Sequence, residues 1–482
     1  MSTFLGIDLG TTHIKAALAD SQGRLLRMAA VDNGPDTACE AGECYTAEGL
    51  WQRAAQAVRE ACRGMEPPAG VGVTGMADSG VALDSEGLPL YPIAPWSNPC
   101  GEEYGPVLEK RFPDLTSRTG QRYHPKFALS RILWLRDHQP QAFRRMARWL
   151  SVTDYLLYRL TGEAATDQTF ACRTLLYRLR ERCWDEELCA YAGVTGRLPR
   201  VLALGGGAAG RVTEPAAGAL GLPAGIPVVS AGHDHLCALY ALESAGLGSA
   251  LNSLGTAEVF VGVSDAPTDP EQCRRLGVNQ GCFAGDRWYW MANLPASGGS
   301  VEWLRRMFSV GGPVGYELFD RSDGLTDAGG VLYLPYLNGS GTPDPDPARR
   351  GAFLGLSSRT TPQQLIAAVN QGIGFETRRI LDSLSSVLGL SVSQVTAVGG
   401  GARNRALVQA KADASGREYQ VCSQSELTVL SAAWQAARAA GESMALPLAA
   451  GERFSPHPDR RSAMEHTYRQ YRALCAAIYR KD

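Results

Sequence analysis

The stretch of sequence that decides the fold lies close to the N-terminus and reads Phe4-Leu5-Gly6-Ile7-Asp8-Leu9-Gly10-Thr11-Thr12. The short apolar run over 4–9, closed by a Gly-Thr-Thr turn, predicts a strand that enters a tight turn. Further strands are predicted over 14–19 and 24–31, with the turn Asp20-Ser21-Gln22-Gly23 between them. Three strands joined by two tight turns predict an antiparallel meander.

Beyond this meander, short apolar strands alternate with helices of amphipathic pattern. A strand, a Gly-Thr turn and a second strand recur near residue 255. This weak internal repeat predicts an α/β protein of two similar domains, over 1–240 and 241–482. We predict strands over 70–75, 226–231, 250–254, 258–263 and 395–398, and helices over 48–62, 128–137, 141–149, 152–160, 298–308, 362–387, 404–415 and 428–440.

Composition and charge argue against several classes of protein. The 482 residues are 45% apolar and carry a net charge of −2, which gives no electrostatic reason to expect nucleic acid or an anionic membrane as a partner. The sequence has no uninterrupted apolar run of about 18 residues, so no membrane span is expected. The first residues lack the basic start of a secretion signal. The 12 cysteines include no C-x-x-C pair, which indicates reduced thiols in a cytoplasmic protein. The oligomeric state stays open, with a homodimer among the options.

Asp8 and the turn that follows it carry the first candidate chemistry. Gly10 lets the backbone approach a phosphate, and the amides and hydroxyls of Thr11 and Thr12 supply donors to an anion. Asp8, at the end of a strand, is placed to hold Mg²⁺ directly or through water, and Lys15 can return to the phosphates. The alternative interpretation is an ordinary hairpin turn.

Two further turns in the second half are candidates for nucleotide binding. Ser253-Leu254-Gly255-Thr256 repeats the Gly-Thr turn after a strand. In Val398-Gly399-Gly400-Gly401-Ala402-Arg403-Asn404, three glycines between a strand and a helix suit close approach of a nucleotide, with adenine against the backbone. The alternative is a plain loop that begins a helix. A P-loop motif is absent, and no G-x-G-x-x-G follows the first strand.

Asp234 is the candidate catalytic residue. It follows the predicted strand over 226–231, and the carboxyl end of a buried strand is where an open α/β sheet exposes ligand sites. An aspartate there can orient an acceptor hydroxyl and take its proton. His233 and His235 flank it and suggest a metal site as an alternative. Alternation along an extended segment would point both histidines to one side and Asp234 to the other.

Together these motifs resemble the FGGY carbohydrate kinases of the actin/hexokinase/heat-shock-70 ATPase superfamily. The resemblance covers nearly the whole chain. It implies two ribonuclease-H-like domains, each a mixed five-stranded sheet with flanking helices, and an active site in the cleft between them. The segments that carry it are Asp8-Leu9-Gly10-Thr11-Thr12, Gly232-His233-Asp234, Ser253-Leu254-Gly255-Thr256, Ser297-Gly298-Gly299-Ser300-Val301-Glu302-Trp303, Leu334-Pro335-Tyr336-Leu337-Asn338-Gly339, Gly351-Ala352-Phe353-Leu354-Gly355-Leu356 and Gly399-Gly400-Gly401-Ala402.

The resemblance implies ATP and Mg²⁺ as cofactors and assigns the residues around them. The phosphates and the metal would lie by Asp8, Gly10, Thr11, Thr12 and Lys15, with Asp8 as the metal ligand. The remaining nucleotide contacts would be Gly255 and Thr256 at the β- and γ-phosphates, Gly298 and Glu302 beside the nucleotide, and Gly400, Gly401 and Asn404 at the adenosine. Asp234 matches the catalytic aspartate of the family's G-x-D motif.

The sugar contacts implied by the resemblance come mainly from the first domain: Ala77, Asp78, Trp96, Lys126, Asp234 and His235, the last bonding a sugar hydroxyl. Two departures leave the sugar open. Trp96-Ser97-Asn98-Pro99-Cys100 lacks the family's acidic-x-arginine ending, and Lys126 stands where relatives often have an aromatic or apolar residue. Lys126 is either a surface lysine or a hint of an acidic or modified sugar.

We therefore expect ATP-dependent phosphorylation of a hydroxyl of a small sugar, either a ketose such as a pentulose or hexulose, or a polyol. The alternatives are a catalytically inactive protein and an actin-like ATPase that acts as a ligand-binding switch without a sugar.

Overall fold

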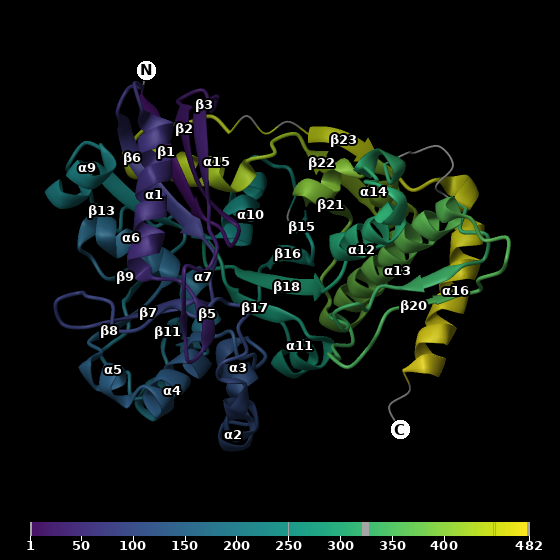
Figure 1. The fold of residues 1–482 in the computed structure, drawn as a ribbon, viewed down its shortest axis with the longest axis horizontal. Coiled ribbons are helices and arrows are strands. Elements are labelled where there is room, and N and C mark those ends of the chain that lie inside the picture. Colours follow the sequence, from purple (N-terminus) through teal and green to yellow (C-terminus); the bar gives the residue numbers. More distant parts are fainter. Residues whose placement is uncertain (1, 249, 321–326, 447, 449, 480–482) are drawn as a thin grey trace.

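Two mixed β-sheets, one in each half of the chain, organise the fold (Figure 1). The computed structural model describes residues 2–248, 250–320, 327–446, 448 and 450–479. Helices flank both sheets, as the predicted α/β class requires. Among the described residues, no helix has both the length and the apolar character needed to cross a membrane.

The N-terminal sheet has the strand order β13-β14-β6-β1-β2-β3. β1, β2 and β3 form the predicted antiparallel meander, and β6 and β14 then add parallel to β1. One face is covered by α1, α6 and α9 and the other by α10 and α15. The bounds are β1 Thr3–Leu9, β2 His13–Asp20, β3 Leu25–Asp32, α1 Ala47–Cys62, β6 Pro68–Gly75, α6 Val152–Thr161, β13 Gly210–Arg211, α9 Glu214–Leu220, β14 Pro227–His233, α10 Asp234–Ser244 and α15 Leu427–Ala439.

Helix α15 comes from the far end of the sequence and packs directly on β1 and β6. Its backbone approaches so closely that a Cβ added at Gly6 would lie 1.9 Å from the carbonyl oxygen of Val429, and one at Gly72 would lie 2.0 Å from that of Ala432. Glycine at both positions permits this approach. The division into domains at residue 240 stays a prediction, and α15 ties the C-terminal half to the N-terminal sheet.

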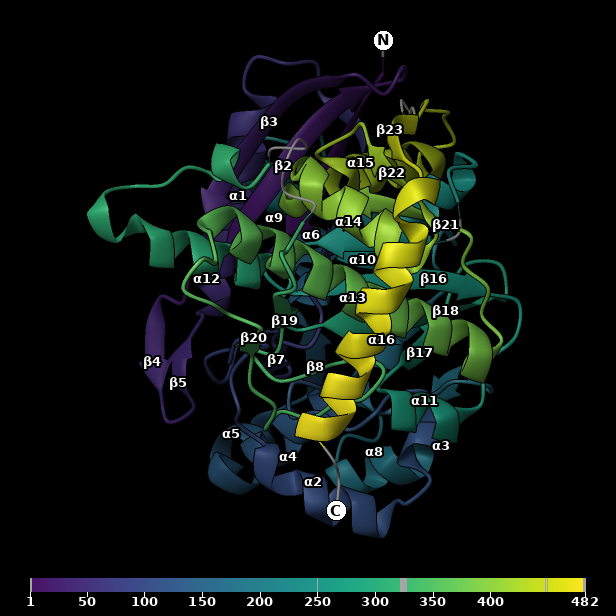
Figure 2. The ribbon, with the colours of Figure 1, turned by 90° about the vertical axis from the view of Figure 1, so that its right-hand side faces the viewer.

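The C-terminal sheet has the order β17-β18-β16-β15-β21-β22-β23. Figure 2 shows α13, α14 and α16 stacked beside it. α13 begins at a capping box of Thr361 and Gln364 and ends at Gly389 in the left-handed conformation. The bounds are β15 Ala250–Leu254, β16 Glu258–Ser264, β17 Asn279–Cys282, β18 Trp288–Leu294, α12 Gly298–Phe308, α13 Pro362–Leu388, β21 Gln394–Val398, α14 Arg405–Ser415, β22 Glu418–Cys422, β23 Ala450–Phe454 and α16 Arg461–Ile478.

Both sheets share one five-stranded plan, which accounts for the sequence repeat. β3-β2-β1-β6-β14 and β18-β16-β15-β21-β22 each consist of an antiparallel meander followed by two parallel strands. The strand count differs from the expected five, because within the described residues the sheets have six and seven strands. The extra strands, β13, β17 and β23, all lie at sheet edges, where they pair with backbone amides and carbonyls that would otherwise have no partner in the sheet.

One predicted helix is wrong. The segment 141–149 was expected to be helical, but α5 (Pro140–Arg145) ends early and β8 (Arg148–Ser151) pairs with β7 (Gly80–Leu83). Here long-range strand pairing overrides the local helical pattern. The other elements are β4 Thr37–Cys39, β5 Gly42–Cys44, α2 Gly105–Arg111, α3 Leu115–Thr119, α4 Ala128–His138, β9 Ala165–Asp167, α7 Gln168–Ala171, β10 Tyr177–Arg178, β11 Cys183–Trp184, α8 Glu186–Ala192, β12 Arg200–Leu202, α11 Pro270–Leu276, β19 Leu332–Leu334 and β20 Ala352–Leu354.

Candidate active site

The parallel strands of the N-terminal sheet end together and so gather three of the predicted acidic residues. Leu9 pairs with Gly75, and Gly75 pairs with His233, at the ends of β1, β6 and β14. The segments that follow these strands therefore emerge at one edge. Asp8, Asp78 and Asp234 all lie at this edge of the sheet.

Asp8 lies in an environment that favours the binding of a cation. Its Oδ1 is buried and has no hydrogen-bond partner among the described residues. Burial, followed by repulsion from Asp234, raises the pKa of Asp8 from 3.8 to about 7, although Lys15 lowers it in part. A buried carboxylate oxygen without a partner suits a hard metal ion such as Mg²⁺.

The turn after Asp8 is exposed, and its neighbours fix its position. Thr11 Oγ1 accepts a hydrogen bond from Trp96 Nε1 at 3.0 Å, while the Thr12 side chain is free to meet a ligand from solvent. Lys15 Nζ lies 2.7 Å from Glu426 Oε2. Glu426 stands at the start of α15, and the sequence reasoning missed it because it is distant in the chain and matches no motif.

Asp234 lies where β14 gives way to α10 and is held by the two histidines. Its Oδ1 lies 2.6 Å from His235 Nδ1 and 3.3 Å from His233 Nε2. The two imidazole rings are stacked, with centroids 5.3 Å apart. The expectation that the histidines would point away from Asp234 is wrong, because the chain leaves the extended conformation and enters a helix at this residue.

Electrostatics keep Asp234 ionised. Burial alone raises the pKa of a carboxyl, but the neighbouring His235 and His233 outweigh it and hold the pKa of Asp234 well below its usual value. Burial lowers the pKa of His233 to about 3, whereas Asp234 outweighs burial and raises that of His235. Potential ligand atoms of these three side chains lie within 4.8 Å of one another, so a metal ion there stays an alternative.

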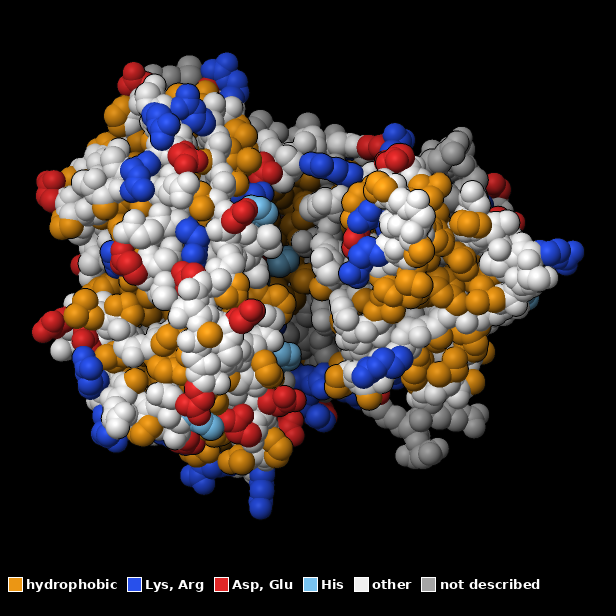
Figure 3. Space-filling view, viewed as in Figure 1, with side chains coloured by type: hydrophobic (Ala, Val, Ile, Leu, Met, Phe, Trp, Pro, Cys, Tyr) orange, Lys and Arg blue, Asp and Glu red, His pale blue; other side chains and the backbone are white. Residues whose placement is uncertain are grey.

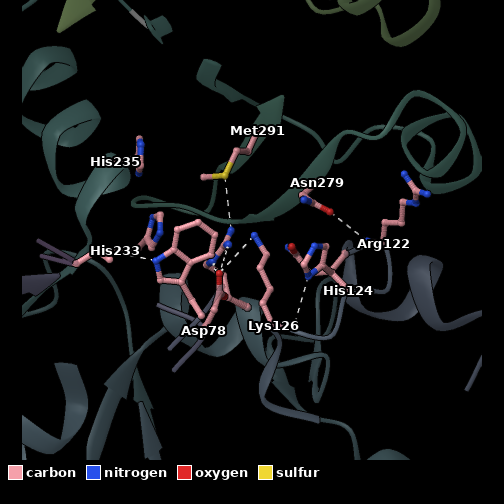
Figure 4. Close-up of polar contacts among 12 residues, drawn as sticks. Asp78, Arg122, His124, Lys126, His233, His235, Asn279 and Met291 are labelled. Carbon is pink, nitrogen blue, oxygen red and sulfur yellow. Dashed lines mark hydrogen bonds and ion pairs between the residues drawn. The ribbon is translucent and has the colours of Figure 1, made fainter. Parts of the chain in front are cut away.

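Asp78 lies at the centre of a cationic pocket (Figure 4). Arg173 donates to it twice, from Nε at 3.0 Å and from Nη2 at 2.6 Å. Lys126 Nζ lies 3.4 Å from Asp78 Oδ2, so Lys126 is no free surface lysine. Ala77 is buried and lines a small cavity beside Asp78, and Trp96 is 39% exposed. Arg173 was not predicted, because it follows a short helix and belongs to no motif.

The first glycine turn of the C-terminal half is locked onto α12. The amide of Gly298 donates to the carbonyl of Gly255 at 3.1 Å, and that of Gly299 donates to Thr256 at 2.9 Å. A Cβ at Gly298 would lie 2.4 Å from the Gly255 oxygen, so this contact requires glycine. Thr256 itself is exposed. The structure thus brings Gly255, Thr256 and Gly298 together.

Glu302, one turn further along α12, pairs with side chains outside the glycine turn. It forms hydrogen bonds with Arg305 and with Tyr316, which lower the pKa of Glu302 to about 2. Its predicted place beside a nucleotide stays a prediction.

The second glycine turn joins β21 to α14 through η5 (Gly400–Arg403). A Cβ at Gly401 would lie 3.0 Å from both the Cβ and the carbonyl oxygen of Leu254, whereas one at Gly400 would meet no atom within 4 Å. Gly401 therefore packs on β15, and Gly400 leaves space for a ligand. Asn404 caps α14, because its side chain accepts from the amide of Leu407 at 3.0 Å.

The two halves of the molecule face each other across a groove, with histidine side chains along its wall (Figure 3). The parallel pairing of β15 with β21 places both C-terminal glycine turns at one edge of their sheet, as in the N-terminal half. A shared site for a triphosphate between these two edges is the arrangement that the sequence predicts.

Comparison with known proteins gives consistent matches over nearly the whole chain. The sequence profile of the FGGY family of carbohydrate kinases, N-terminal domain, matches residues 3–241, and that of its C-terminal domain matches residues 250–440. The xylulose kinase of Escherichia coli is 28% identical over 422 residues, which cover 86% of this chain and 85% of the relative. The glycerol kinase of Thermus brockianus is 28% identical over 463 residues, which cover 92% of this chain and 90% of the relative. A crystal structure described as a xyloylose kinase from Brucella ovis superposes with a TM-score of 0.88 at 25% identity and covers 99% of both chains.

Proposed function

We propose that this chain, which belongs to the FGGY family of carbohydrate kinases, transfers the γ-phosphoryl group of ATP to a hydroxyl of a small ketose or polyol. Its reaction class follows from the family: it is a phosphotransferase that acts on a sugar hydroxyl. The choice of a pentulose, a hexulose or a polyol is our proposal. It is supported by relatives of equal identity that are named for xylulose and for glycerol.

The observation that carries the proposal is the pair of acids Asp8 and Asp234 at one edge of the N-terminal sheet. Phosphoryl transfer needs the acceptor oxygen in line with the phosphorus and little covalent help from the protein. Asp234 is ionised at neutral pH, so it can accept a hydrogen bond from the acceptor hydroxyl and orient it. In a loose transition state the proton leaves late, and Asp234 is the group placed to receive it.

His235 supports Asp234 in this role. Its Nδ1 lies 2.6 Å from Asp234 Oδ1, which fixes the carboxylate and leaves the second oxygen to face the substrate. The other ring nitrogen of His235 can bond a second sugar hydroxyl. Asp78 and Trp96 are the further sugar contacts that we propose.

Kinases of this family use ATP, and the residues of the groove fit its magnesium complex. The unpartnered Oδ1 of Asp8 is an oxygen ligand of the kind that Mg²⁺ prefers. When bound, the ion supplies charge compensation on the phosphate oxygens. Lys15, Thr12 and Thr256 add donors near the phosphates, while the open side of Gly400 would accept the adenosine.

The test is a substrate panel combined with one isosteric variant. ADP release is measured with pentuloses, hexuloses, polyols and sugar acids, for the wild type and for Asp234→Asn. We expect kcat to fall by about 10²- to 10⁴-fold in the variant, because the hydroxyl loses its proton acceptor while substrate binding persists.

Asp413 offers a matched control. It is a buried aspartate paired with a histidine, His457, at 3.0 Å, and it belongs to the C-terminal half away from the acidic edge. Asp413→Asn should leave turnover unchanged. Near wild-type turnover in Asp234→Asn, or an equal loss in both variants, would show that Asp234 is not the base. A folded wild type that turns over no sugar, sugar acid or polyol would contradict the proposed reaction.

A further inference from the structure

The pocket around Asp78 contains more positive charge than its own carboxylate can match. Arg173 already binds Asp78 in a bidentate pair. Lys126 adds a second cation, at 3.4 Å from the same Oδ2 that Arg173 Nη2 contacts at 2.6 Å. Since one carboxylate balances one guanidinium, the ammonium of Lys126 is the surplus charge.

The neighbouring titratable groups do not supply the missing negative charge. His124 accepts a hydrogen bond from the Lys126 amide, and burial lowers its pKa to about 4, so it is neutral at pH 7. His233 is neutral as well, with a pKa of about 3. Asp234 is ionised but is already paired with His235 at 2.6 Å.

Both cations are held in place by an aromatic ring as well as by Asp78. They lie over the fully buried Phe127 ring, with Lys126 Nζ at 5.3 Å and Arg173 Cζ at 5.5 Å from its centroid. Arg173 is 4% exposed, and the acceptor that its Nη1 finds is the thioether sulfur of Met291, at 3.6 Å. A thioether is a weak acceptor for a buried guanidinium. Arg173 is buried and the Lys126 side chain is 22% exposed, so two like charges lie close together where water screens them only in part, which is costly unless an anion joins them.

We propose that the substrate carries a carboxylate, which binds Lys126 Nζ and Arg173 Nη1, so that the preferred acceptor is a polyhydroxy acid such as an aldonate or a keto-aldonate. This inference rests on the proposed kinase function and specifies its substrate. A carboxylate offers two oxygens, one for the ammonium and one for the guanidinium. Figure 4 shows His233 and His235 on one side of Asp78 and Lys126 on the other, so the acid end lies away from Asp234.

The experiment compares three substrates of the same chain length: the acid, its carboxamide and the neutral ketose or polyol. The carboxamide keeps the shape of the acid and removes its charge. We expect wild-type kcat/KM for the acid to exceed that for the carboxamide by about 10- to 100-fold, the usual effect of a charged hydrogen-bonded pair. Calorimetric binding of acid and carboxamide to the wild type, without nucleotide, should show the same preference.

Lys126→Met is the decisive variant, and Lys110→Met, at an exposed position on α2, is its control. Lys126→Met should lose the preference for the acid, because kcat/KM should fall about 10- to 100-fold more for the acid than for the carboxamide, whereas Lys126→Arg should keep part of the preference. Equal or better turnover of the neutral compound by the wild type would overturn the inference and leave the kinase function intact. An equal loss for acid and carboxamide in Lys126→Met would overturn it too. Turnover of none of the three would count against the proposed function itself.

Discussion

Among single residues, Asp8 lies in an environment that suits a bound cation but destabilises its own carboxylate in the absence of one. Its pKa is raised to about 7 from 3.8, mainly by burial and then by Asp234. Between these two pH values the unfolded chain releases the proton and the folded chain keeps it. Wild-type stability therefore falls as the pH rises from about 4 to about 7.

Asp8→Asn should consequently be more stable than the wild type at pH 7.5, by about 2 to 4 kcal/mol, and no more stable near pH 4. Thermal unfolding of both proteins at the two pH values measures the difference. ATP turnover should fall by about 10²-fold or more, because the metal and phosphates lose a ligand. A gain in stability that is the same at both pH values would refute the assigned cause of the pKa shift.

The residues that the sequence could not reveal share one physical property: their role depends on distant contacts. Asp8 lies near the end of a strand, and Asp78 and Asp234 come after strands, whose apolar runs and glycine turns are visible locally. Arg173, in contrast, binds Asp78 from 95 positions away, and Glu426 binds Lys15 across 411 positions. Neither position has a local pattern that would signal the contact.

At the scale of secondary-structure elements, the turn between β21 and α14 contains two adjacent glycines with different roles. Gly401 packs against the protein, and Gly400 is proposed to contact the ligand. A methyl group at Gly401 would lie 3.0 Å from Leu254, so Gly401→Ala should destabilise the protein by about 1 to 3 kcal/mol. A methyl group at Gly400 meets nothing within 4 Å, so Gly400→Ala should leave stability within about 0.5 kcal/mol of the wild type.

If the adenosine lies against Gly400, Gly400→Ala should still raise KM for ATP, by about 10-fold, without changing KM for the sugar. Steady-state kinetics with each substrate varied in turn, together with thermal unfolding of both variants, would check this. The proposed adenosine site would be disproved by a Gly400→Ala enzyme with an unaltered KM for ATP. The sugar KM serves as the internal control.

The same scale shows which elements the sequence predicts reliably. All five strands of the N-terminal core could be predicted, since each is an apolar run bounded by turn residues. In the C-terminal core the prediction covers β15, β16 and β21 and misses β18 and β22. The edge strands β13, β17 and β23 could not, because pairing at an edge depends on a partner that is already folded. The failed helix at 141–149 has the same origin: β8 exists because β7, about 70 positions earlier, presents an open edge.

For the whole molecule, the contacts between the halves indicate how the groove could close. The segment after α3 bonds to β17: Gln121 Nε2 donates to the carbonyl of Gln280 at 2.6 Å, and the Arg122 amide donates to Asn279 Oδ1 at 3.1 Å. Helix α15 provides another connection, on the N-terminal sheet, and α7 provides a further one through Gln168 Nε2, which donates to the carbonyl of Phe283 at 2.7 Å. A rotation about these connections would move the glycine turns of the two sheets toward each other.

We therefore expect the radius of gyration to decrease when nucleotide and acceptor are both bound, because closure would surround the phosphates and exclude water. Small-angle scattering of Asp234→Asn with Mg²⁺-ATP and substrate is the sharpest measurement, since this variant should bind both ligands and turn them over too slowly to leave the ternary state. The same variant with either ligand alone is the control, and it should show a smaller decrease. An unchanged radius in every ligand state would mean that the two edges already stand at their working distance. The triphosphate would then have to span the groove as the structure has it.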